Sequence, residues 1–84
     1  MSRDTLRLSQ EEMGRRFDEL RAIKKGESEK FDLVAQKWSK RKGKSVTSRM
    51  VRKYWNKVHT LDKRGVNLHE AAKVYTWSYI IWTL

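Results

Sequence analysis

The chain has 84 residues, with 20 Lys or Arg against 10 Asp or Glu, so its net charge is +10. It contains no cysteine, which excludes disulfides and thiolate metal sites. It also contains no proline and only four glycines, which disfavours a fold with many β turns. A chain this short has a thin core. We therefore expect a single all-α domain over residues 1–84, stabilised by close helix packing, by oligomerisation or by both.

The charge is distributed unevenly. Residues 1–32 hold eight acids and eight bases, whereas residues 33–84 hold two acids and twelve bases. Between Asp32 and Asp62 there are nine Lys or Arg and no acid. A field of one sign attracts polyanions such as DNA, RNA or an anionic membrane surface. The pattern favours a polyanion partner, and the alternative is a basic face that only keeps the protein in solution.

The first predicted helix covers residues 8–26, "LSQEEMGRRFDELRAIKKG". Ser9 and Glu12 have capping-box spacing, Gly26 suits a left-handed helix end, and Gly14 weakens the helix. An apolar stripe at helical spacing is formed by Met13, Phe17, Leu20 and Ile23. Acids interleaved with arginines should form surface ion pairs, and these acids are Glu11, Glu12, Asp18 and Glu19.

The second predicted helix covers residues 28–40, with one apolar face formed by Phe31, Val34, Ala35 and Trp38. The basic segment "KRKGKS" follows at residues 40–45. A third helix is expected over residues 46–61, capped by Ser45 or Thr47. Its inner stripe would consist of Val51, Trp55 and Val58, flanked by Met50 and Tyr54. Its opposite face is entirely polar or basic, and carries Ser48, Arg49, Arg52, Lys53, Asn56 and Lys57.

The fourth segment covers residues 67–84, with Asn67 as a candidate N-cap. Its rear half is rich in aromatic and β-branched residues, so helix and strand are both allowed, and we favour helix. One helix face would consist of Ala71, Val74, Tyr75, Ser78, Ile81 and Trp82, which leaves Trp77 and Tyr79 pointing elsewhere. Exposed aromatic residues often mark a partner surface. We therefore expect packing or homodimerisation here, through Trp77, Tyr79 and Trp82.

Other functional classes find little support in the sequence. His59 and His69 stand apart, without cysteines or an acidic cluster to complete a metal site, and no glycine-rich phosphate loop occurs. We expect neither an enzyme nor a bound metal or cofactor. No segment has the roughly 18–20 apolar residues that span a bilayer. The expected location is intracellular, in the cytoplasm or nucleoid or in a nucleus.

The segment "LVAQKWSKRKGKSVTSRMVRKYWNKV" resembles a helix-turn-helix. Val34 and Ala35 fall where the two helices need small residues, and Trp38 falls where an apolar residue packs beneath the turn. The three-helix order over residues 9–59 is similar to homeodomain and Myb-like folds. The spacing departs from the family, because Trp38 and Thr47 are nine positions apart and the usual turn has about three or four residues. Either the second helix continues to Lys42, or the turn is a longer basic loop.

The resemblance implies a DNA-binding protein with a regulatory or DNA-organising role, whose third helix enters the major groove. Candidate base-reading residues are Arg49, Arg52, Lys53 and Asn56. Candidate phosphate contacts are Lys40, Arg41, Lys42, Lys44, Ser48 and Lys57. The alternatives are a basic protein–protein interaction module, a binder of single-stranded DNA or RNA that stacks bases on Trp or Tyr, and, less expected, an anchor on a membrane surface.

Overall fold

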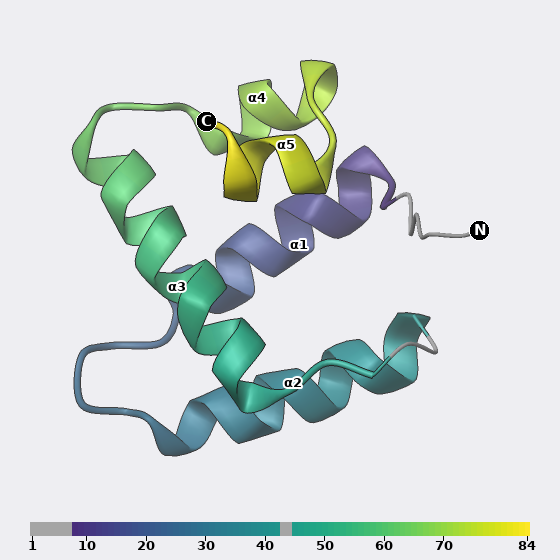
Figure 1. Ribbon diagram of the computed structural model, residues 1–84, viewed down its shortest axis with the longest axis vertical. Coiled ribbons are helices and arrows are strands. Elements are labelled where there is room, and N and C mark those ends of the chain that lie inside the picture. Colours follow the sequence, from purple (N-terminus) through teal and green to yellow (C-terminus); the bar gives the residue numbers. More distant parts are fainter. Residues whose placement is uncertain (1–7, 43–44) are drawn as a thin grey trace.

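The computed structural model describes residues 8–42 and 45–84, which form five helices and no strand (Figure 1). The helices are α1 (Gln10–Arg21), α2 (Glu29–Lys42), α3 (Ser48–Lys63), α4 (Leu68–Val74) and α5 (Trp77–Trp82). The all-α prediction is confirmed, and the C-terminal segment is helical rather than extended. Figure 1 shows α1 between α2 on one side and the α4–α5 pair on the other. Within the described ranges, no helix combines the length and the apolar character needed to cross a membrane.

Helix α1 begins as expected but ends early. The Ser9 hydroxyl accepts a hydrogen bond from the Glu12 N–H at 3.0 Å. The predicted end at Gly26 is wrong, because the helix stops at Arg21. If α1 continued to Gly26, the backbone groups of Ile23 and Lys24 would bond within the helix. Instead, the Ile23 carbonyl accepts a hydrogen bond from the Trp55 indole N–H, and the Lys24 N–H donates to the Glu27 carboxylate. Gly26 has the positive φ expected of it, 92°, but in the turn that follows.

The connection between α2 and α3 folds back on itself. Helix α2 continues to Lys42, which decides between the two alternatives for this segment. The chain then returns to α2, because the Val46 N–H donates to Ser39 Oγ at 2.8 Å and the Ser39 hydroxyl donates to the Val46 carbonyl at 3.2 Å. Thr47 caps α3 by accepting from the Met50 N–H. Helix α3 therefore begins beside Ser39, three residues before the end of α2.

The core lies where α1, α2 and α3 meet the C-terminal helices. Val51 and Val58 are buried as predicted, whereas Trp55 is only half-buried and Tyr54 takes the inner position. The prediction that Trp77 points away from the core is wrong, since only 8% of it is exposed. Its ring stacks on that of Phe17, with 5.5 Å between centroids, and lies edge-on to the rings of Trp38 and Tyr54.

A break in the C-terminal segment puts Trp77 there. Tyr75 is extended, and the Thr76 hydroxyl accepts from the Tyr79 N–H to start α5 afresh. The break rotates α5 so that Trp77, Ile80 and Ile81 enter the core together. The single helix face predicted for residues 67–84 is therefore wrong, and Val74 is 75% exposed. Asn67 does cap α4, as predicted, by accepting from the Glu70 N–H.

Candidate nucleic-acid interface

The outer face of α3 is the most basic surface that the sequence predicts, and it is open to solvent. Arg49, Arg52, Lys53 and Asn56 are exposed, while Ser48 and Lys57 are partly exposed. Among residues 8–42 and 45–84, no carboxylate lies within ion-pair distance of the four cations in this set. The buried stripe on the other side of the helix holds this face in place.

Lys53 has a partner that the sequence did not indicate. Its Nζ lies 4.3 Å from the centre of the Trp82 ring, a cation–π contact between α3 and α5. Trp82 is itself 58% exposed. The basic face of α3 therefore continues onto an aromatic residue of α5.

Arg41 does not belong to the exposed basic set. Its Nη2 lies 2.8 Å from Glu12 Oε2 and 2.9 Å from Glu19 Oε1, so its charge is shared between two carboxylates of α1. The hydrogen bond to Glu19, followed by the one to Glu12, raises the pKa of Arg41 far above its ordinary value despite partial burial. Arg41 fastens α2 to α1, so a phosphate would have to compete with these two carboxylates for its guanidinium.

The same cluster overturns the surface position expected for Glu12. Glu12 is buried, and it pairs with Arg16 as well as Arg41. Burial alone raises the pKa of Glu12, but the hydrogen bonds from Arg41 and Arg16 outweigh it and lower the pKa below its ordinary value. Arg16 is only 3% exposed, and its guanidinium lies 4.3 Å from the Trp38 ring centre. The charge of Glu12 is thus turned inward and neutralised, whereas Glu11 and Asp18 of the same helix stay exposed.

Asp62, the acid nearest the basic face along the chain, is also neutralised. Arg21 of α1 donates two hydrogen bonds to it, from Nε to Oδ2 at 3.1 Å and from Nη2 to Oδ1 at 2.8 Å. The hydrogen bond from Arg21 lowers the pKa of Asp62. This pair fastens α3 to α1 and offsets a charge that would repel a polyanion.

Of the lysines predicted to contact phosphate before α3, the structure describes the side chain of Lys40 alone. Lys40 is exposed and lines a groove of about 440 Å³ together with Ser39, Val46 and Ser48, so it lies near the start of α3. The side chain of Lys42 and the whole of Lys44 lie outside the described residues. The basic turn thus contributes Lys40 to the interface as described, while Arg41 is withdrawn from it.

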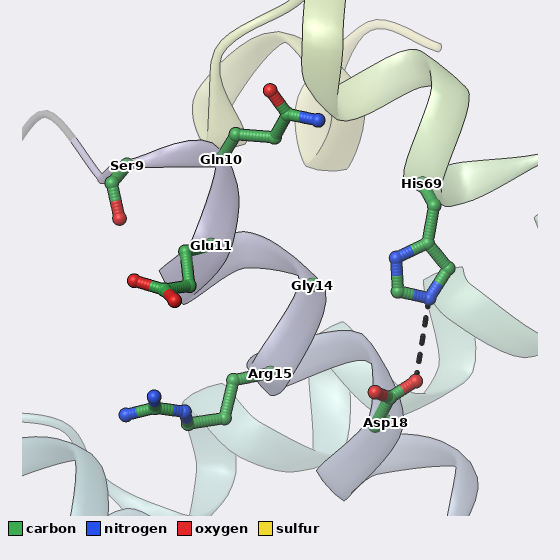
Figure 2. A pocket seen from close by; sticks show the side chains of 7 residues that line it. All are labelled: Ser9, Gln10, Glu11, Gly14, Arg15, Asp18 and His69. Carbon is green, nitrogen blue, oxygen red and sulfur yellow. Dashed lines mark ion pairs between the residues drawn. The ribbon is translucent and has the colours of Figure 1, made fainter.

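A wider hollow of about 740 Å³ lies between α1 and α4 (Figure 2). His69 Nε2 lies 3.3 Å from Asp18 Oδ1 at one edge of it. Gly14 lines the same hollow, and a Cβ there would lie 3.2 Å from His69 Nδ1, so glycine allows α4 to approach. Gly14 is thus a packing position as well as a weak helix former. The carboxylates of Glu11 and Asp18 make this hollow a poor match for a polyanion.

Trp55 and the turn at residues 24–28 form another hollow beside α3, which the sequence did not indicate. Lys24 and Lys25, expected in a helix end, instead line this hollow together with Arg52 and Asn56. The only sequence signal was the dipeptide of lysines before Gly26.

No protein-family model matches the chain, and neither a curated protein nor a solved structure matches it.

Proposed function

We propose that the protein binds double-stranded DNA through the exposed face of α3, with a regulatory or DNA-organising role inside the cell. The observation that carries this proposal is the separation of charge. Arg49, Arg52 and Lys57 point outward without a paired carboxylate among the described residues, whereas Glu12, Glu19 and Asp62 are held in ion pairs with other cations. Such a face attracts the phosphates of a duplex and releases its counterions.

The geometry of the turn supports a helix-turn-helix reading of α2 and α3. Val34, Ala35 and Trp38 are buried, as the resemblance requires. The hydrogen bonds between Ser39 and Val46 bring the chain back to α2 just before α3 begins. In this unit the second helix enters the major groove while the first crosses the backbone.

The side chains of the proposed interface, on α3 and at the end of α2, divide by chemistry. Arg49 and Arg52 can donate two hydrogen bonds to guanine, and Asn56 can exchange two with adenine. Lys40, Ser48 and Lys57 suit phosphate contacts, which position the protein without reading sequence. To contact DNA, the Lys53 side chain has to move away from the Trp82 ring, or the two side chains have to move together.

Charge reversal tests this assignment. Arg49→Glu with Arg52→Glu should lower the affinity for a duplex at least 100-fold, since two attractive contacts become repulsive. Arg15→Glu with Lys37→Glu is the matched control: both residues are exposed, they lie on α1 and α2, and the net charge changes equally. Fluorescence anisotropy with a labelled duplex measures the affinity, and circular dichroism checks the fold. Equal losses in the two variants would overturn the assignment to α3.

The salt dependence provides a second arm of the same experiment. About six phosphate contacts imply a loss of about three decades in affinity between 50 and 200 mM salt. A flat response in the wild type would contradict polyanion binding altogether.

Single-stranded nucleic acid is the second candidate ligand, because the exposed ring of Trp82 lies beside Lys53. Bases stack on such rings with little sequence preference. A single strand that binds more tightly than the duplex of the same sequence, and loses this advantage in Trp82→Ala, would favour it.

A further inference from the structure

The hollow beside α3 has a composition different from that of the open basic face. It is a half-open hollow of about 450 Å³, a volume within the range of roughly 300–1,000 Å³ that small-molecule sites occupy. Phe31 and Trp55 supply aromatic surface, and Lys24, Lys25 and Arg52 supply positive charge. An aromatic wall next to a cluster of cations suits a ligand that is flat at one end and anionic at the other.

The aromatic wall is held in position. The Trp55 indole N–H donates to the Ile23 carbonyl at 2.8 Å, and the Phe31 ring lies edge-on to it with 5.7 Å between ring centroids. His59 packs against Trp55 as well, with 4.3 Å between ring centroids. Trp55 is only half-buried because it lines the hollow. A ring fixed in this way loses little conformational freedom when a second aromatic group stacks on it.

The charged rim also fits an anion. Glu27 is the one carboxylate lining the hollow, and it is engaged by the Lys24 N–H at 2.7 Å and by Lys30 Nζ at 3.1 Å. These contacts lower the pKa of Glu27, and Lys30 offsets its charge. Gly26 lies in the left-handed region, and a Cβ on it would meet no atom within 4 Å, so the rim is open at this turn.

We propose that this hollow is a nucleotide site. The residues that would bind the nucleotide are Lys24, Lys25, Arg52, Trp55 and Asn56. The base stacks on Trp55, Asn56 offers an amide to its edge, and the phosphate lies among Lys24, Lys25 and Arg52. The nucleotide is either free or an unpaired residue of a bound strand. The second case rests on the proposed function, since Arg52 and Asn56 belong to both surfaces.

Nuclear magnetic resonance of the full chain with AMP is the direct test. AMP should shift the Trp55 indole resonance saturably and leave those of the buried Trp38 and Trp77 unchanged. Adenosine or inorganic phosphate alone should bind at least about tenfold more weakly, because each engages one half of the site. An unmoved Trp55 resonance, or equal binding of phosphate and AMP, would overturn the proposal.

Lys24→Gln with Lys25→Gln is the variant of choice, because both residues are exposed and lie in a turn. It should weaken AMP binding about tenfold or more, and the spectrum of the free variant should remain that of a folded protein. Arg15→Gln with Lys37→Gln, with the same loss of charge, should leave AMP binding unchanged. Equal weakening in both variants would mean a general attraction of anions and would overturn the site.

Two duplexes distinguish the sources of the nucleotide. If the nucleotide comes from a strand, a duplex with one unpaired adenosine binds more tightly than its fully paired counterpart and shifts the Trp55 resonance. If it is free, AMP shifts Trp55 and the two duplexes bind alike. The paired duplex also separates this inference from the proposed function. Duplex binding together with a Trp55 resonance that AMP does not shift overturns the nucleotide site alone, and an AMP response without duplex binding overturns the α3 interface alone.

Discussion

The buried pair of Glu12 and Arg16 joins three helices. Glu12 accepts hydrogen bonds from Arg16 of its own helix and from Arg41 of α2, while Arg16 lies against Trp38 of α2 and Trp77 of α5. Removing one partner of a buried ion pair leaves the other charge uncompensated, unless a second counter-ion remains. Glu12 has such a second counter-ion in Arg41, whereas Arg16 pairs with Glu12. The two residues of the buried pair are therefore unequal in what they contribute to stability.

Glu12→Gln should lower the free energy of unfolding by about 3 kcal/mol, because it leaves Arg16 buried without a counter-ion. Arg16→Met should change it by about 1 kcal/mol or less, because Glu12 keeps Arg41 and the methionine side chain packs on Trp38. Urea denaturation of both variants measures the difference. A larger loss in Arg16→Met than in Glu12→Gln would contradict this description of the pair.

For single residues, the sequence predicts the contacts that depend on near neighbours along the chain. Ser9, Thr47 and Asn67 cap helices as expected, since each accepts from an N–H three positions along. The burial of Glu12 was not predictable in the same way. Its environment depends on Arg41, which is 29 positions away, and alternating acids and arginines are typical of an exposed helix.

At the scale of elements, the α4–α5 pair turns one aromatic residue inward and leaves others outside. Trp77 enters the core, while Tyr75 and Tyr79 stack on each other at the surface with 4.4 Å between ring centroids. Val74 and Trp82 are exposed as well. Large apolar side chains exposed on two neighbouring helices commonly mark contact with another protein. The expected dimer surface therefore loses Trp77 and gains Val74 and Tyr75.

We expect the protein to self-associate through this surface, as helix-turn-helix proteins do when they bind two half-sites. Val74→Ser with Tyr79→Ser should shift the sedimentation coefficient toward that of a monomer. Leu33→Ser is the control, because Leu33 is a large exposed apolar residue on α2. Wild type that sediments as a monomer at high concentration would sink this expectation.

Helix α3 shows why part of the candidate site could be predicted. Charged residues recurring at helical spacing opposite Val51 and Val58 indicate an outer face from sequence alone, and that face is exposed. The hollow around Trp55 could not be predicted, because it needs α1 to end at Arg21 and the following turn to lie against α3. The hydrogen bond that holds this segment to α3 joins Trp55 and Ile23, which are 32 positions apart.

At the scale of the whole molecule, three carboxylates fasten helices together. Glu12 and Glu19 join α1 to α2, and Asp62 joins α3 to α1. Hydrogen bonds from their arginine partners lower the pKa of each carboxylate in the folded protein, against the opposing effect of burial. The ionised forms are thus preferred more strongly in the folded than in the unfolded state.

Acid should therefore destabilise the protein, with a defined sign. The unfolded carboxylates bind protons near pH 4.5 for Glu and 3.8 for Asp, above the pKa values of the folded state. The stabilisation is complete above those values and is lost as the pH falls through the folded pKa values. Melting temperatures should be level from about pH 7 to 5 and fall below that. Glu19→Gln should show a shallower fall, and a wild-type curve that stays level down to about pH 3 would contradict the role of these pairs.

The two hydrogen bonds between Ser39 and Val46 have a consequence for how this chain can vary. They fasten the segment before α3 directly to α2, through groups other than the lysine side chains of residues 40–44. Gain or loss of lysines there should therefore tune affinity for a polyanion independently of the fold.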